Sequence, residues 1–454
     1  MRLSGSQKKH IATNQPVRVI CLSFIIVIML GTIILTLPFC SKDGQFTPFL
    51  DALFTATSAT CVTGLVVYDT FLKWSFAGQL IILLLIQIGG LGILTITSFF
   101  NIALGRKLGL RGAHLASETA NALDLSDTPR LLKAIMLVSF LFETVGALLL
   151  MADFVPRYGS DGVFLSIFLS VSAFCNAGFD LLGREGEYIS LSHYNDNTYV
   201  LVIISFLIIF GGLGFLVWKD LAQYRKTKKL LLHTRVVLVV SGILIAAGTL
   251  MFLLFEWHNE KTIGSLPIAQ RILASYFQSV TSRTAGFNSV DMLGMNSITK
   301  LFMIILMFIG ASPGSTGGGI KTTTFAVIII TVASVVSGRE DAVLFKRRVD
   351  KPIVYKALSI SVFAVIIVLT TMSVIYFTSE EAIDGMNALF ESVSAFSTVG
   401  LSTGVTQIAN IPSRIVLIIA MFIGRVGPVS MALSLSLRQG RRAEIIPEGK
   451  ILVG

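Results

Sequence analysis

The sequence predicts an all-α integral membrane fold in which four pseudo-symmetric membrane-pore-membrane repeats surround one central pore. Of the 454 residues, 54% are hydrophobic and 14% are charged, and the mean hydropathy is +0.80. This composition is too apolar for a soluble protein. Eight apolar stretches are each long enough to cross a bilayer, which takes about 20 residues. Between them, a glycine-centred hairpin recurs four times at nearly constant spacing.

We expect eight transmembrane helices, together with four pore half-helices. The first apolar stretch follows a basic N-terminus but lacks a small-residue cleavage site, so it is interpreted as a span and not as a signal peptide. The eight stretches are approximately 17–39, 73–103, 131–155, 198–220, 235–257, 297–335, 353–377 and 411–437.

The distribution of basic residues predicts the orientation in the membrane. With the N-terminus inside, 25 of the 36 lysines and arginines fall in cytoplasmic segments and only eight fall outside. This is the positive-inside pattern. It predicts that both termini are cytoplasmic and that the four hairpins enter the membrane from outside.

The four glycines at the hairpins are Gly64, Gly178, Gly286 and Gly400, separated by 114, 108 and 114 residues. Such regularity indicates internal duplication. A phenylalanine stands ten residues before the glycine in three copies and nine before it in the third (Phe54, Phe168, Phe390 and Phe277). The expected repeats are 1–104, 105–222, 223–337 and 338–437, followed by a cytoplasmic tail at 438–454. Their pore loops are expected at about 49–66, 163–181, 272–289 and 386–403.

The stretch before each glycine is too short to span and too polar to face lipid, so it must be buried in protein or line water. A half-helix that returns as an extended strand places carbonyl oxygens where they can replace a cation's hydration shell. Glycine permits the left-handed backbone that this requires. The alternative is that these glycines only let helices pack closely. The candidate filter residues are Cys61, Val62, Thr63, Gly64, Cys175, Asn176, Ala177, Gly178, Thr284, Ala285, Gly286, Ser397, Thr398, Val399 and Gly400.

The second span of the third repeat contains a break at residues 310–324. Its glycines and one proline cannot sustain a helix, so we expect an intramembrane loop beneath the filter. The candidate gate residues are Gly310, Ser312, Pro313, Gly314, Ser315, Thr316, Gly317, Gly318, Gly319, Lys321 and Arg425. Glycines at the corresponding places of the first, second and fourth repeats are hinge or packing positions (89–92, 211–214 and 424–427). Packing is favoured in the first two repeats.

Several charged residues lie at membrane depth. Arg425 lies within an apolar span and needs an interior partner or cavity; a structural ion pair between helices is one alternative. Arg283 is interpreted as a strut behind the filter. Lys321 either steadies the loop or meets a carboxylate. Glu391 either tethers such a cation or brings cations to the pore mouth.

The chain resembles the Trk/Ktr/HKT superfamily of potassium uptake proteins along almost its whole length, and the KtrB type in particular. The most specific pieces are 397–401, 176–179, 284–288, 312–324 and 447–454. The resemblance implies potassium as the transported ion, sodium as an activator and no organic cofactor. It also implies that loop 310–324 is a gate and that Arg425 is an electrostatic barrier beneath the filter. Only Thr398, Val399 and Gly400 reproduce the Thr-Val-Gly of potassium channels, so selectivity is expected to be looser.

The resemblance further implies a homodimer in the bacterial cytoplasmic membrane, controlled by a separate ring of KtrA-type nucleotide-binding subunits. Membrane lipids are expected partners, whereas nucleic acid is not. A sodium- or proton-coupled secondary transporter is the alternative function, although its inverted repeats are not evident here. An enzyme is not expected, because the histidines are scattered over termini and loops and the four cysteines show no metal-ligand spacing.

Overall fold

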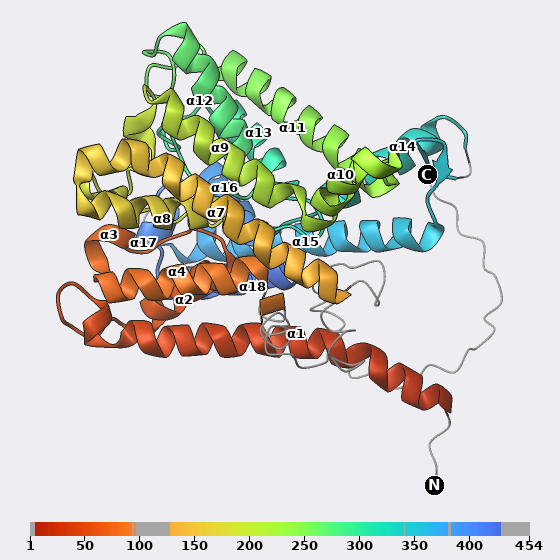
Figure 1. Ribbon diagram of the computed structural model, residues 1–454, viewed down its shortest axis with the longest axis horizontal. Coiled ribbons are helices and arrows are strands. Elements are labelled where there is room, and N and C mark those ends of the chain that lie inside the picture. The colour runs from red at the N-terminus through yellow and green to blue at the C-terminus, as the bar shows by residue number, and fades with distance from the viewer. Residues whose placement is uncertain (1–4, 93–94, 97–127, 340, 380–382, 428–454) are drawn as a thin grey trace.

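The computed structural model describes residues 5–92, 95–96, 128–339, 341–379 and 383–427, and these are mostly helical (Figure 1). The expected C-terminal tail at 438–454 lies outside this part of the chain. The α-helices are α1 (Gly5–Thr36), α2 (Phe49–Cys61), α3 (Thr70–Lys73), α4 (Phe76–Leu91), α7 (Thr128–Tyr158), α8 (Ser160–Cys175), α9 (Thr198–Leu213), α10 (Phe215–Thr227), α11 (Leu232–Glu256), α12 (Ile268–Thr281), α13 (Ser297–Phe308), α14 (Thr322–Val336), α15 (Lys351–Thr378), α16 (Gly385–Phe396), α17 (Val405–Ile408) and α18 (Ile411–Val426). Short 3-10 turns occur at Pro38–Cys40, Leu182–Arg184 and Ser192–Tyr194, and strands β1 (Val343–Leu344) and β2 (Arg347–Arg348) form an antiparallel pair.

Four of the described helices are individually long and apolar enough to cross a membrane, namely α1 from Arg18, α7 from Leu132, α11 and α15. In the most apolar stretch of each of these helices, only 22% to 39% is buried inside the protein. Large side chains such as Leu30, Leu148 and Ile366 are exposed on them. This surface is suited to lipid, and it makes the chain a multi-pass membrane protein. The total of eight spans stays a prediction, since several expected spans are shorter in the structure or run beyond its described residues.

Two expected spans differ from a straight helix. In the span expected at 198–220, packing was favoured over a hinge for the glycines at 211–214, yet the chain bends there: α9 ends at Leu213, and α10 continues at 93° to it. The bend occurs at Gly214, whose φ of +95° is left-handed and easily adopted only by glycine. The span at 297–335 is broken, as predicted, between α13 and α14. The loop comprises residues 309–321 and is shorter than expected, because 322–324 form the first turn of α14.

Four short helices, α2, α8, α12 and α16, lie inside the bundle, each packed on the long helix that precedes it. Their phenylalanines Phe54, Phe168, Phe277 and Phe390 are fully buried. The helix that follows each short helix also packs against the next short helix along the chain: α4 against α8, α9 against α12, α13 against α16, and α18 against α2. The last contact joins the end of the chain to its beginning, so the arrangement closes on itself.

Glycines allow the inner helices to approach closely. A Cβ added to Gly89, Gly211 or Gly424 would lie 1.9, 1.9 or 1.7 Å from a carbonyl oxygen in a neighbouring short helix. These oxygens belong to Thr60, Phe174 and Phe396, each four residues before its hairpin glycine. Packing therefore explains these three glycines, and Gly214 is the bend. In the third unit, a Cβ added to Gly310 would lie 2.2 Å from the carbonyl oxygen of Gly318 in the loop.

Candidate functional site

A side-chain hydroxyl near the end of each short helix holds the hairpin that follows. The Oγ atoms of Ser58 and Ser394 accept hydrogen bonds from the N–H groups of Gly64 and Gly400, both at 3.1 Å. In the other two units the hydroxyl donates to the carbonyl of the residue after the glycine. These bonds join Ser172 to Phe179 at 2.6 Å and Thr281 to Phe287 at 2.7 Å. Each hairpin is thus fixed to its own helix.

The backbone of the four hairpins has a shared conformation. The residue two positions before each glycine is left-handed, and so is the glycine itself. The φ values are 58° and 94° for Val62 and Gly64, 57° and 70° for Asn176 and Gly178, 75° and 83° for Thr284 and Gly286, and 50° and 94° for Thr398 and Gly400. Left-handed backbone at a residue other than glycine is strained by roughly 1–3 kcal/mol, and such strain concentrates at functional sites.

The four glycines meet in a closed ring. A Cβ added to Gly64 would lie 2.5 Å from the carbonyl oxygen of Ala177, and one added to Gly178 would lie 2.8 Å from that of Ala285. A Cβ added to Gly286 would lie 2.4 Å from the Val399 oxygen, and one added to Gly400 would lie 2.2 Å from the Thr63 oxygen, which closes the ring. Hairpins more than 100 residues apart in sequence therefore bring their carbonyl groups together around one axis, with no room for a side chain at any of the four glycines.

The loop at 309–321 lies against one side of this ring. A Cβ added to Gly317 would lie 2.1 Å from the Thr284 hydroxyl, and one added to Gly318 would lie 2.2 Å from the Thr398 hydroxyl. The loop is anchored to the bend after α9, because the N–H groups of Ser312 and Thr316 donate to the carbonyls of Gly212 and Gly211 at 3.1 and 3.3 Å. The loop thus lies between the end of α9 and the threonines of the third and fourth hairpins.

Two cations hold the loop. Arg425 of α18 donates to the carbonyl of Thr316 in the loop and to those of Gly89 and Gly90 at the end of α4. The alternative of a structural ion pair between helices is not seen among the described residues, where all the partners of Arg425 are backbone carbonyls. Lys321 donates to the carbonyls of Gly317 at 2.6 Å and Gly318 at 3.5 Å. It therefore steadies the loop.

Residues 3–445 match the family described as TrkH, cation transport protein. The chain belongs to this family. It is 38% identical to the potassium/sodium uptake protein NtpJ of Enterococcus hirae, with 97% of both chains covered. It is 39% identical to the Ktr system potassium uptake protein B of Bacillus subtilis, again with 97% of both covered. The crystal structure of the potassium transporter TrkH from Vibrio parahaemolyticus is similar in fold, with a TM-score of 0.70 at 17% identity, covering 93% of this chain and 85% of that one.

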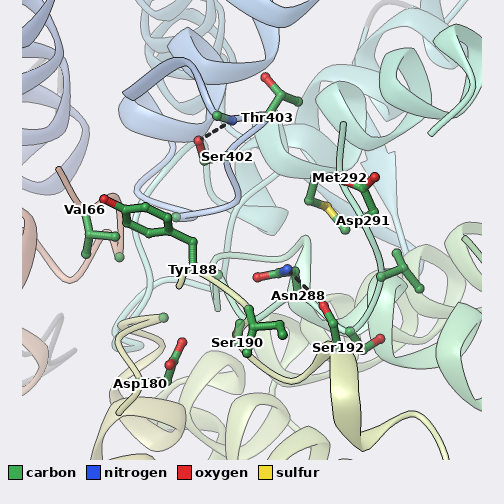
Figure 2. Close-up of a pocket in the computed structure, with 18 of the residues that line it drawn as sticks. Val66, Asp180, Tyr188, Ser190, Ser192, Asn288, Asp291, Met292, Ser402 and Thr403 are labelled. Atoms are coloured by element: carbon green, nitrogen blue, oxygen red, sulfur yellow. Dashed lines mark hydrogen bonds between the residues drawn. The ribbon is translucent and has the colours of Figure 1, made fainter. Parts of the chain in front are cut away.

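The matched family is a family of membrane ion transporters, and it indicates no catalytic function. The remaining residues of the site are therefore considered for what they contribute to an ion path. On the side of the ring opposite the loop, all four hairpin glycines line a vestibule of about 680 Å³. Figure 2 shows side chains of its wall, among them Asp180, Asn288 and Asp291. This wall carries several acidic side chains and one lysine, namely Asp69, Asp180, Glu187, Asp291 and Lys261.

Glu391 of α16 has neither of its expected roles. Its side chain is fully buried, so it does not face the vestibule, and its partners are not cations. The carboxylate accepts hydrogen bonds from the Ser402 hydroxyl at 2.8 Å and from the N–H groups of Thr403 and Thr406 at 3.3 and 3.1 Å. It also accepts one from the Thr406 hydroxyl. Glu391 therefore fixes the segment that leaves the ring after Gly400.

Arg283 is placed as expected, behind the third hairpin. Its guanidinium donates to the Ser241 hydroxyl of α11 at 3.1 Å and borders a small cavity with Val280 and Ala311. The two cysteines among the candidate filter residues, Cys61 and Cys175, are the last residues of α2 and α8. The Cys175 thiol lies 3.7 Å from the amide oxygen of Gln87 on α4, which keeps it behind the second hairpin.

Sequence reasoning missed the anchoring hydroxyls. A detectable signal existed: a serine or threonine stands six residues before the glycine in three units (Ser58, Ser172 and Ser394) and five before it in the third (Thr281). The shorter spacing in the third unit matches the shift of its phenylalanine. The whole Ser/Thr-rich stretch was interpreted only as polar, which hid the one hydroxyl in each copy that contacts the hairpin.

Proposed function

We propose that this chain is the ion-conducting subunit of a potassium uptake system, which moves potassium inward down its electrochemical gradient. The observation that carries the proposal is the closed ring of four glycines, in which each glycine lies against a backbone carbonyl oxygen of a neighbouring unit. Backbone carbonyls so arranged replace the hydration shell of a cation. The names of the relatives, a Ktr system potassium uptake protein B and a potassium/sodium uptake protein, support potassium as the main cargo.

The four hairpins act as the selectivity filter in this proposal. Glycine at all four ring positions suits potassium, because any side chain there enters the space of a neighbouring carbonyl. The hairpins differ in sequence, and only the fourth has Thr-Val-Gly (398–400). We therefore expect a preference for potassium over sodium that is weaker than in a symmetric channel.

Loop 309–321 acts as the gate. Its glycines Gly317 and Gly318 approach the hydroxyls of Thr284 and Thr398 closely, so an ion leaving the ring meets the loop at once. The Arg425 contacts to Thr316 and to the end of α4 hold the loop in this position and place a positive charge beneath the ring. Conduction requires the loop and this charge to move together.

The chain is proposed to act in the bacterial cytoplasmic membrane with both termini inside, as a homodimer. The excess of lysine and arginine in the expected cytoplasmic segments supports this orientation. Control is assigned to a separate cytosolic KtrA-type nucleotide-binding ring, with sodium as an activator. The "Ktr system" in the names of relatives supports a membrane subunit that works with other components.

Uptake of radioactive rubidium by proteoliposomes loaded with potassium tests the proposal. We expect uptake that follows the potassium gradient and is unchanged when an ionophore collapses the proton gradient. Deleting residues 314–319 should raise the flux, because the obstruction below the ring is removed. Loss of uptake on collapsing a proton or sodium gradient would favour the coupled transporter, and a deletion without effect on flux would contradict the gate.

A further inference from the structure

A cluster of exposed cations lies where α10 ends. Arg225, Lys226, Lys228 and Lys229 are all exposed, and they occupy the last turn of α10 and the turn that joins it to α11. Arg235, in the first turn of α11, is exposed as well. The sequence contains no aspartate or glutamate between residues 220 and 256. None of the five cations forms an ion pair with a described residue, so their charge is available to an external anion.

The direction of α10 suits a helix that runs along the membrane surface. It turns through 93° from α9, an expected span, and it lies at the end of the bundle where α1 and α7 begin (Figure 1). This is the end expected to face the cytoplasm. The helix carries Trp218 and Tyr224, residue types that occupy the boundary between lipid and water, and Tyr224 is 47% exposed. A helix in this position presents its cations at the depth of the lipid phosphate groups.

The packing of α10 holds this cluster in a defined place. Val217 is fully buried and packs in one apolar cluster with Leu213 of α9 and Val237 of α11. Asp220 is buried too, and its Oδ2 accepts a hydrogen bond from the N–H of Leu231 at 2.9 Å. This bond fixes the turn between α10 and α11. The cations are therefore presented by an ordered turn between two packed helices, as a binding site requires.

The first residue of α10 is bonded to the loop at 309–321. The N–H of Phe215 donates to the carbonyl of Gly314 at 2.9 Å. A Cβ added to Gly214 would lie 2.7 Å from the carbonyl oxygen of Pro313, so the bend and the loop are in close contact. These contacts add to the two hydrogen bonds that join the end of α9 to the loop. A shift of α10 relative to the membrane must therefore move the loop or break the bond to Gly314.

We propose that the basic end of α10 binds the phosphate groups of anionic phospholipids in the cytoplasmic leaflet, and that this binding regulates the gate through the hydrogen bond from Phe215 to Gly314. The inference rests on the proposed function and adds a regulator to it. Bound lipid holds α10 against the membrane in the arrangement described above, in which the loop is attached to it. Anionic lipid should therefore lower the flux. Lipid is favoured over dissolved phosphate as the ligand, because the membrane surface concentrates its phosphate groups beside the helix.

The test measures rubidium uptake by the purified chain, with no other protein, in vesicles of phosphatidylcholine alone and of phosphatidylcholine with about one third phosphatidylglycerol. For the unaltered chain we expect uptake to be roughly 3- to 10-fold lower with phosphatidylglycerol. The negative surface also attracts rubidium, which acts in the opposite direction and cannot produce this fall. A variant with Arg225→Gln, Lys226→Gln, Lys228→Gln and Lys229→Gln should take up rubidium equally in both compositions.

The matched control carries the same number of charge changes at the same end of the molecule. It combines Lys346→Gln, Arg347→Gln, Lys351→Gln and Lys356→Gln, all at exposed positions around β2 and the start of α15. Neither element is hydrogen-bonded to the loop at 309–321 among the described residues. The control should therefore keep the fall in uptake with phosphatidylglycerol.

The connection between α10 and the loop is tested at Phe215. Phe215→Pro removes the N–H that donates to Gly314, and proline is well tolerated at the first position of a helix. This variant keeps every cation but should lose the effect of phosphatidylglycerol on uptake. Phe215→Ala removes the same ring and keeps the N–H, so it should retain the effect. Equal behaviour of the two variants would contradict regulation through this bond.

The inference is overturned if the unaltered chain takes up rubidium equally in both compositions, as expected if these cations dock a protein instead. It is also overturned if the glutamine variant of α10 keeps the fall, or if the control loses it. Glycerol phosphate dissolved with phosphatidylcholine vesicles should have no effect; a fall as large as that with phosphatidylglycerol would make the ligand dissolved phosphate and overturn the lipid site. Failure of the proposed function is distinguishable, since the unaltered chain would then show no uptake along a potassium gradient in either composition.

Discussion

Gly64→Ser introduces a side chain at a crowded position of the proposed filter. The φ of Gly64 is +94°, and the new Cβ would lie 2.5 Å from the Ala177 oxygen and 3.0 Å from the Cα of Gly178. Real Cβ contacts are essentially never shorter than 3.0 Å, so the Ala177 carbonyl must move by at least about 0.5 Å. A side chain in left-handed backbone adds a penalty of roughly 1–2 kcal/mol.

Both effects are relieved only by shifting the backbone whose carbonyls surround the axis. We therefore expect the preference for potassium-like ions to fall by a comparable amount, about 1–2 kcal/mol, which is roughly a 5- to 30-fold fall in the ratio of rubidium to sodium uptake. The assay is paired uptake of radioactive rubidium and sodium by proteoliposomes containing equal amounts of protein.

Gly404→Ser provides a matched control. Its φ is +91°, which gives a similar backbone penalty, but no atom lies within 4 Å of an added Cβ. It should therefore retain the uptake ratio of the unaltered chain. Equal ratios in Gly64→Ser and Gly404→Ser would refute the reasoning, because crowding at the ring would then have no influence on selectivity.

Two further substitutions test the packing around the ring. Glu391→Gln keeps the shape of the side chain but points an amide donor at the donors of Ser402 and Thr406. We expect a loss of about 2–3 kcal/mol in stability, measured as a lower thermal unfolding temperature in detergent. An unchanged unfolding temperature would contradict the role of the Glu391 carboxylate. Gly211→Ala should destabilise by roughly 1–3 kcal/mol in the same measurement, because its Cβ would lie 1.9 Å from the Phe174 oxygen. Gly242→Ala is its control, since no atom lies within 4 Å of that Cβ and alanine favours helix; an equal loss in both variants would argue against close packing at Gly211.

The geometry of the ring was accessible from the sequence because it follows from local rules that repeat. Each copy combines a short polar helix, a residue that turns left-handed and a glycine at a fixed offset, and the copies are about 110 residues apart. Duplicated units of similar local structure can pack around one axis. The regular spacing of the glycines was therefore enough to predict four repeats around one pore. The interrupted span at Phe308 and Thr322 was similarly visible, because its glycines and proline cannot continue a helix.

The partners of the buried charged residues were not accessible in this way. Arg425 contacts Gly89 across 336 positions of sequence, and it does so through backbone carbonyls that every residue possesses. No pattern of residue types in the sequence predicts such a contact. The partners of Glu391 could not be predicted from the sequence either. Whether its carboxylate contacts a cation, the vestibule or nearby N–H groups depends on how the segment after Gly400 folds back.

By itself, the sequence determined that this chain lies in a membrane and that four hairpins of one kind recur along it, since hydropathy and spacing are properties of the chain. Only the tertiary structure decided that α9 bends at Gly214, that α18 packs against α2 and closes the circle, and that Arg425 donates to a carbonyl of the loop at 309–321. These features depend on which surfaces meet across hundreds of residues, and packing, unlike periodicity, is settled only when the whole chain is in place.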